Sequence, residues 1–140
     1  MGIKEKQDEI IEEFAFFEDW MDKYAHIIDL GKDLELIEER DKREENLIKG
    51  CQSRVWLVAE TDQDGKLKFK ADSDAIITKG IIALLIGVVN GEYPETVAKE
   101  ELYFVNEIGL KEHLSPTRSN GLVSMIKQMK YYALALASKN

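Results

Sequence analysis

The stretch from Ala75 to Asn90 constrains the fold most, because it is apolar nearly all round. Drawn as a helix, it places branched aliphatic side chains on every side: Ile76, Ile77, Ile81, Ile82, Leu84, Leu85, Ile86, Val88 and Val89. A helix without a polar face is buried. The stretch therefore predicts a central helix, in which Gly80 and Gly87 indicate close packing and which ends at Asn90-Gly91.

An amphipathic pattern near the N-terminus predicts helix that covers this centre. Its apolar residues recur at steps of three and four: Ile10, Phe14, Phe17, Met21, Tyr24 and Ile28. We expect one helix, or two with a break near Glu18–Asp19, and Gly31 as the C-terminal stop. The charged run from Lys32 to Glu45 predicts a surface connection with about one helical turn.

Two alternating segments predict a β-hairpin. Val55, Leu57 and Ala59 alternate with other residues, and Leu67, Phe69 and Ala71 alternate with lysines. The stretch 61–65 between them ends in glycine and predicts a turn. A two-stranded hairpin is rarely stable alone, so it should pack on helices, and residues 46–49 are a candidate third strand.

The C-terminal half predicts further helices. Short ones are expected from Pro94 to Ala98 and from Leu102 to Leu110, followed by a polar loop over His113–Asn120. A final helix from Gly121 to Ala137 has these inward positions: Leu122, Met125, Ile126, Met129, Ala133 and Leu136. The order of elements predicts an α+β fold, a small antiparallel sheet packed against several helices, in one domain over residues 1–140.

Composition limits the function. The chain has 140 residues and a net charge of −8, which disfavours nucleic acid and anionic membranes as partners. No secretion signal is visible in Met1–Glu13, and the apolar stretch Ile81–Val89 is too short to span a bilayer. A single cysteine excludes an internal disulfide and a metal site built from several thiolates. It fits a reducing compartment, so we expect a cytoplasmic protein without a metal.

Three polar clusters occupy junctions between the expected elements, where a scaffold presents side chains. They are Gly50–Ser53, Asp72–Asp74 and Ser115–Asn120. The carboxylates of the second cluster suit either acid–base chemistry or capping of the central helix, and capping is the simpler explanation.

Cys51 has two interpretations at this point. Free cysteine is often a small buried hydrophobe. Alternatively, it is a reactive thiol, for which the adjacent Gly50 indicates a loop and Arg118 offers a cation. Of the two histidines, His113 in the expected loop is a better partner for a cysteine hydrolase or transferase than His26, which accompanies apolar residues.

Three ordered motifs resemble those of the SufE family of sulfur acceptor proteins, which includes the CsdE type. The segments are 46–56 around Cys51, 72–80, and 113–121, and the helical start with Trp20, Tyr24 and residues 27–31 also fits. The resemblance covers nearly the whole chain.

This resemblance implies a partner and a reaction. SufE-like proteins bind a pyridoxal phosphate-dependent cysteine desulfurase of the SufS or CsdA type, take sulfur as a persulfide on the cysteine matched by Cys51, and pass it toward an iron–sulfur cluster assembly scaffold. Such a protein is an accessory to the desulfurase and has no cofactor of its own. The family fold is similar to that of the IscU-type scaffold, which uses several cysteines, whereas one thiol fits a carrier.

The supporting residues receive expected roles under this resemblance. Gly50 lets the loop bend, Gln52 and Ser53 hold its backbone, Asp74 fixes the resting loop directly or by capping the helix, and Arg118 favours the thiolate or forms the rim that a partner contacts. A monomer or weak homodimer is expected. The alternatives are a cysteine hydrolase or transferase using Cys51 and His113, and a non-catalytic interaction module with Cys51 in the core.

Overall fold

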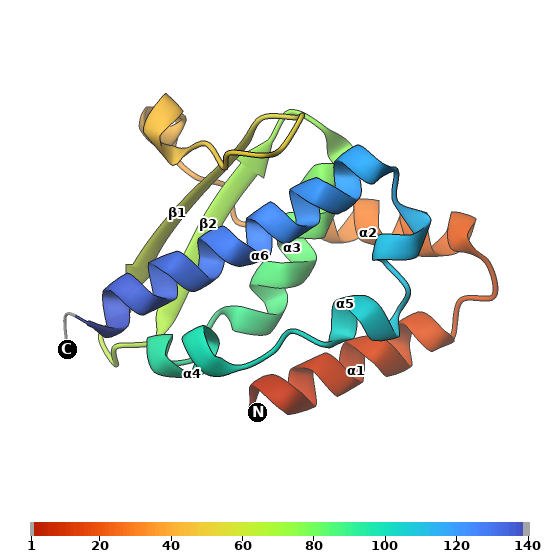
Figure 1. Ribbon diagram of the computed structural model, residues 1–140, viewed down its shortest axis with the longest axis horizontal. Coiled ribbons are helices and arrows are strands. Elements are labelled where there is room, and N and C mark those ends of the chain that lie inside the picture. The colour runs from red at the N-terminus through yellow and green to blue at the C-terminus, as the bar shows by residue number, and fades with distance from the viewer. Residues whose placement is uncertain (1, 139–140) are drawn as a thin grey trace.

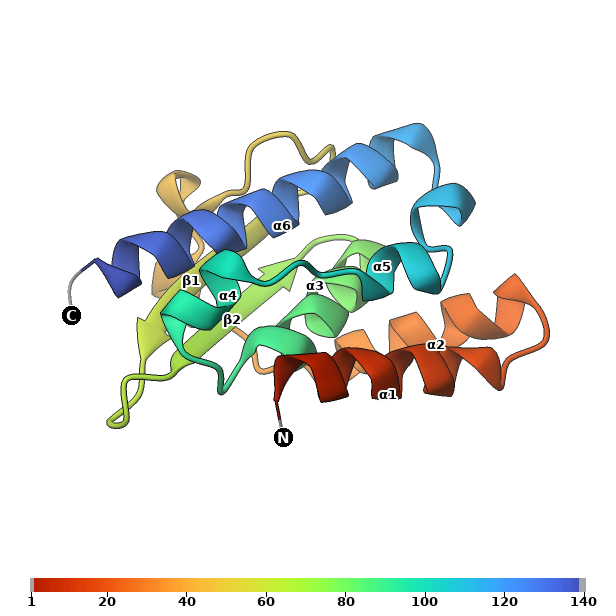
Figure 2. The ribbon, with the colours of Figure 1, turned by 60° about the horizontal axis from the view of Figure 1, so that its bottom comes forward.

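A central helix organises the molecule, as the sequence predicts. The computed structural model describes residues 2–138, so Met1 and residues 139–140, at the ends of the expected domain, lie outside it. Helix α3 (Ile76–Val89) is buried along most of its length and packs against α2 (Trp20–Lys32), the sheet and α6 (Pro116–Ala137). Figure 2 shows α3 between α6 on one side and the α1–α2 pair on the other. The α+β prediction is confirmed.

The N-terminal helix is broken in two, at the place that the sequence predicts. Helix α1 (Ile3–Ala15) ends before the connection at residues 16–19, and the side chain of Asp19 caps α2 by accepting a hydrogen bond of 2.9 Å from the backbone N–H of Asp22. The charged connection that follows α2 holds two short 3-10 turns, Glu39–Asp41 and Glu44–Asn46, rather than one helical turn.

The hairpin is also confirmed, but its third strand is not. Strands β1 (Val55–Thr61) and β2 (Leu67–Ser73) pair antiparallel around a turn in which Gly65 has φ +79°. Residues 46–49 form no strand: Leu47 makes a single antiparallel bridge to Trp56, and Ile48 N–H donates to Val55 O at 2.8 Å. The hairpin is instead completed by helices, because β2 packs on α3 (Figure 1).

Gly31 is not the helix stop that we predicted from its residue type. Helix α2 continues to Lys32, and Gly31 lies against α3, where a Cβ atom would be 2.9 Å from the backbone nitrogen of Gly80. A Cβ atom on Gly80 would in turn overlap the carbonyl of Ile27. The two glycines let the helix backbones touch, whereas an added Cβ on Gly87 would meet nothing within 4 Å.

Helix α6 begins earlier than expected, because Ser115-Pro116 starts a helix. The hydroxyl of Ser115 accepts from the N–H of Arg118 at 3.3 Å, and Pro116 occupies the first helical position. The predicted loop over His113–Asn120 is therefore wrong beyond Ser115. As a result, Arg118 lies in the first turn of α6 and Gly121 lies within the helix.

Smaller elements complete the fold. Helix α4 (Pro94–Lys99) matches the prediction, whereas the predicted helix over Leu102–Leu110 shortens to α5 (Phe104–Glu107), followed by a 3-10 turn at Lys111–His113. Asp72 and Asp74 do not cap α3: its N-cap residue is Ala75, whose side chain makes no capping bond, and from this cluster only the Ser73 hydroxyl accepts there, from the N–H of Ala75 at 3.2 Å. Among the described residues, no helix has the length and apolar character needed to cross a membrane.

Candidate functional site

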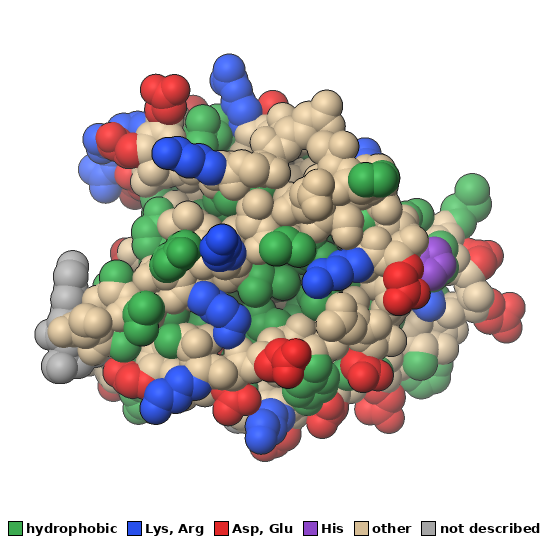
Figure 3. Space-filling model, viewed as in Figure 1, with side chains coloured by type: hydrophobic (Ala, Val, Ile, Leu, Met, Phe, Trp, Pro, Cys, Tyr) green, Lys and Arg blue, Asp and Glu red, His purple; other side chains and the backbone are tan. Residues whose placement is uncertain are grey.

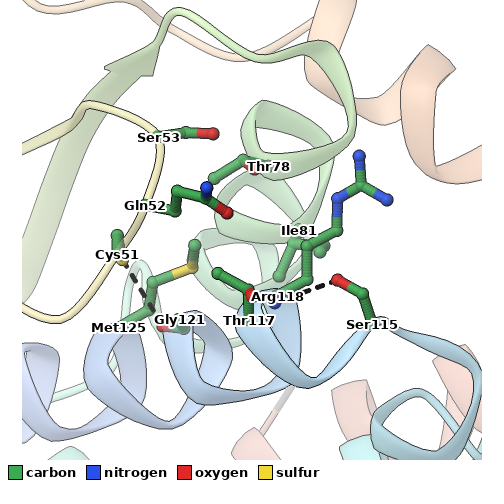
Figure 4. Close-up of a pocket in the computed structure, with 10 residues that line it drawn as sticks. All are labelled: Cys51, Gln52, Ser53, Thr78, Ile81, Ser115, Thr117, Arg118, Gly121 and Met125. Carbon is green, nitrogen blue, oxygen red and sulfur yellow. Dashed lines mark hydrogen bonds between the residues drawn. The ribbon is translucent and has the colours of Figure 1, made fainter.

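Two of the three polar clusters meet around one pocket. It has a volume of about 230 Å³ and lies between the cysteine loop, α3 and the first turns of α6 (Figure 4). Its lining consists of Cys51, Gln52, Ser53, Thr78, Ile81, Ser115, Thr117, Arg118, Gly121 and Met125. The sequence identified the first and third clusters as candidate sites, but it did not predict that Gly121 and Met125 lie beside them. A glycine within the final helix is the signal that could have indicated the close contact between α6 and the cysteine loop.

Cys51 is half-buried on the wall of this pocket. Its thiol donates a hydrogen bond of 3.6 Å to the carbonyl of Gly121, and its side chain packs against the edge of the core. Burial raises the pKa of the Cys51 thiol, because the thiolate loses hydration there. In the resting site the Cys51 thiol is therefore protonated and partly shielded from water. This state lies between the two interpretations of the sequence, a fully buried cysteine and a reactive thiol.

Gly50 makes the close approach of the loop to α6 possible. Its φ is +93°, a backbone conformation that only glycine adopts readily. A Cβ atom at this position would also overlap the side chain of Ser124 on α6. Both the conformation and the contact therefore require glycine immediately before the thiol.

The far end of the cysteine loop is held by the second polar cluster. The carboxylate of Asp74 accepts from Arg54 N–H at 3.1 Å, and the hydroxyl of Ser73 donates to Arg54 O at 2.8 Å. Asp74 thus fixes the loop directly, rather than by capping α3. Gln52 and Ser53 line the pocket but form no side-chain hydrogen bond within the described residues, so the backbone contacts predicted for them are made by Asp74 and Ser73 instead.

Asp72 forms structural ion pairs rather than acting as an acid–base group. It is buried and forms ion pairs with Lys42 at 3.0 Å and Lys79 at 3.5 Å. Burial alone would raise the pKa of Asp72, but hydrogen bonds from Lys42 and from the N–H of Ser73, together with the two lysine charges, lower it. Lys42 also lies over the ring of Trp56, 5.6 Å from its centroid, so it fastens the 3-10 turns to β1.

Arg118 and His113 stand apart from the thiol. Arg118 is exposed, and its guanidinium lies on the side of the pocket away from Cys51 (Figure 4). His113 stacks on Trp20 at a centroid distance of 4.0 Å, its Nδ1 lies 2.9 Å from Gly109 O, and it does not line the pocket. The structure thus brings Arg118 to the rim, but it does not assemble a Cys51–His113 dyad.

Among residues 2–138, no group of three or more His, Cys, Asp and Glu side chains is arranged to hold a metal ion.

Comparisons with known proteins identify the family. A family model described as SufE, the Fe-S metabolism associated domain, matches residues 8–133. The chain belongs to the SufE family. It is 39% identical over 127 residues to an uncharacterized SufE-like protein of Rhizobium meliloti, covering 88% of this chain and 91% of that protein. A second uncharacterized SufE-like protein, from Rhizobium etli, is 38% identical over 135 residues, covering 94% of this chain and 91% of that protein.

The fold recurs in a solved structure of low sequence identity. The solution structure of a hypothetical protein from Thermus thermophilus superimposes with a TM-score of 0.79 at 19% identity, covering 95% of this chain and 96% of that one. This likeness extends the SufE fold to a distant sequence. The family assignment itself places the chain in iron–sulfur metabolism.

The burial of Cys51 in this SufE-family chain predicts how the alkylation rate of its thiol depends on pH. A free thiol titrates near pH ~8.5, and burial shifts the pKa of Cys51 upward. The rate of alkylation of the native protein by iodoacetamide should therefore reach half of its maximum above that pH, whereas the urea-unfolded chain serves as the control at the ordinary value. A native profile that coincides with the unfolded one would contradict the protonated resting state.

Proposed function

We propose that this protein accepts sulfur from a pyridoxal phosphate-dependent cysteine desulfurase as a persulfide on Cys51, and passes it toward an iron–sulfur cluster assembly scaffold in the cytoplasm. The observation that carries the proposal is a single thiol on a glycine-hinged loop, above a pocket walled by the family's other two motif regions. Membership of the SufE family supports a role in iron–sulfur metabolism, and the geometry of the pocket supports Cys51 as the residue that accepts sulfur.

The transfer step needs no cofactor on this chain. The Cys51 thiolate attacks the outer sulfur of the donor's persulfide, a new S–S bond forms at Cys51, and the bond between the donor's two sulfurs breaks. The electron pair of that bond leaves with the donor cysteine as its thiolate, so no net oxidation occurs. The same exchange with an acceptor thiol then unloads Cys51. The protein therefore serves as an accessory to the desulfurase rather than as a stand-alone enzyme.

The resting geometry suits storage better than attack. A neutral thiol bound to the Gly121 carbonyl is a poor nucleophile, so the docked state must move the loop toward water or toward a cation. We assign the hinge to Gly50 and the rim contact to Arg118, which is exposed at the pocket edge. After transfer, the pocket beside Ile81 and Met125 offers the outer sulfur a place away from stray thiols.

The decisive experiment is intact mass spectrometry after incubation with a SufS-type desulfurase and free cysteine. The wild-type chain should gain the mass of one sulfur atom, and dithiothreitol should remove it. Cys51→Ser should gain none. Sulfur uptake by Cys51→Ser, or a wild-type chain that stays unmodified while the desulfurase carries its own persulfide, would overturn the proposal.

A further inference from the structure

The pocket beside Cys51 contains a buried polar group that the resting protein leaves without a partner. Thr78 is only 6% exposed and lines the pocket (Figure 4). Its hydroxyl forms no hydrogen bond with any other residue in the part of the chain that the structure describes. A buried hydroxyl costs free energy when it has no partner, so a ligand that pairs with it is favoured in this pocket.

The first turns of two helices reach the same pocket, α3 through Thr78 and α6 through Thr117. The N-cap residue of α3 is Ala75, which offers no side-chain oxygen, and the N–H groups of Ile76, Ile77 and Thr78 have no acceptor among the described residues. The N–H of Thr117 also has none there. Because the N-terminus of a helix is partly positive and its first N–H groups are free, both ends favour a bound anion.

The charge of the lining favours an anion as well. Arg118 is exposed at the rim, and among residues 2–138 no Asp or Glu lines the pocket, although the whole chain has a net charge of −8. Figure 3 shows acidic side chains gathered along the edge formed by α1, whereas the surface over the first turns of α6 is mostly uncharged. A lining without a carboxylate offers no partner to an ammonium group. The ligand is therefore an anion rather than a zwitterion such as free cysteine.

We propose that this pocket binds a small sulfur-carrying oxyanion of the thiosulfate class, and that Cys51 takes its outer sulfur. The hydroxyls of Thr78 and Thr117 donate to the oxygens of the anion, Arg118 turns in from the rim to balance its charge, and the outer sulfur faces Cys51. The volume of about 230 Å³ admits an ion of this size. The inference rests on the persulfide chemistry proposed for Cys51, but it needs no desulfurase.

The transfer balances without a further reactant. The Cys51 thiol first loses its proton to water when the loop opens at Gly50. The thiolate then attacks the outer sulfur of thiosulfate, a new S–S bond forms at Cys51, and the bond between the two sulfurs of thiosulfate breaks. The electron pair of that bond leaves with sulfite. The products are a persulfide on Cys51 and one sulfite ion, so atoms and charge are conserved.

Intact mass spectrometry with sodium thiosulfate as the only sulfur source tests this site. The wild-type chain should gain the mass of one sulfur atom and release an equal amount of sulfite, which a colorimetric assay measures. Cys51→Ser should do neither. Sodium sulfate is an oxyanion without a transferable sulfur, so it should compete and slow the loading more than sodium chloride does at equal ionic strength.

Variants of the oxyanion partners separate binding from thiol chemistry. Thr78→Val keeps the shape of the side chain but removes the hydroxyl, and it should lower the loading rate at low thiosulfate about tenfold, with a smaller effect at saturation. Thr78→Ser keeps the hydroxyl and should restore the rate, and circular dichroism checks the fold of both. Arg118→Gln should behave like Thr78→Val. Its matched control is Arg43→Gln, which removes an exposed positive charge outside the pocket and should load like wild type.

The outcomes distinguish this inference from the proposed function. A chain that a desulfurase loads but thiosulfate leaves unmodified would overturn the oxyanion site alone. Equal loading rates for wild type, Thr78→Val and Arg118→Gln at low thiosulfate would overturn it too. A chain that thiosulfate loads through these residues but a desulfurase does not would instead overturn the proposed function and support the oxyanion site.

Discussion

Replacing Gly80 by alanine should lower the free energy of unfolding by about 3 kcal/mol, the upper part of the range for overpacking a close contact. The added Cβ atom overlaps the carbonyl of Ile27, which is backbone and has no rotamer to change. Relief requires α2 to move away from α3, and this is the most extensive helix contact of the fold. Urea unfolding followed by circular dichroism measures the change.

The control for this substitution lies on the same helix. An alanine at Gly87 meets nothing within 4 Å and is exposed, so only helix propensity acts there. We expect Gly87→Ala to raise the free energy of unfolding by about 1 kcal/mol. If the two alanine variants shifted stability in the same direction, the close contact between α2 and α3 would not be what requires glycine at position 80.

Gly50→Ala should make the Cys51 thiol react faster. The new side chain costs about 1–2 kcal/mol in a positive-φ conformation, before its overlap with Ser124 is counted. That penalty falls on the resting loop, so the open population should rise by roughly 5–30-fold. Alkylation of native protein by iodoacetamide, followed by intact mass, should accelerate by a similar factor while secondary structure stays unchanged.

Gly65→Ala separates loop opening from general destabilisation. Gly65 also has a positive φ, +79°, but it lies in the hairpin turn with nothing within 4 Å of an added Cβ atom. The two variants share the backbone penalty, yet only Gly50→Ala should change the alkylation rate. Equal acceleration in both would mean that alkylation follows global unfolding rather than movement of the cysteine loop.

The sequence predicted the elements of the fold that have a regular local pattern of apolar residues. The apolar run of α3 and the alternation of β1 and β2 are regular over many residues, so their type and approximate bounds were confirmed. The start of α6 was missed because polar residues fill its first turns, and the capping pair Ser115-Pro116 outweighs them. Gly31 looked like a stop because its contact with Gly80 exists only in the folded chain.

The site was predictable as a set of motifs but not as a geometry. The family resemblance led to Cys51 and to the segments that surround it, and the family is confirmed. The state of the thiol depends on Gly121, which is distant in sequence, and the loop anchor depends on Asp74 reaching Arg54. The first pairing arises only when α6 packs beside the loop, whereas the second continues the pairing of β1 with β2 one position beyond Val55 and Ser73.

The hydrogen bond of 2.8 Å from Ile48 N–H to Val55 O closes the base of the cysteine loop, and this limits how far the Cys51 thiol can move. Cys51 is three residues from the nearer side of that base, and an extended chain covers at most about 3.6 Å per residue. The tether is therefore only about 10 Å long. A short tether cannot reach into a deep tunnel. Under the proposed function, the desulfurase therefore has to bring its persulfide to the surface of this protein on a mobile segment of its own.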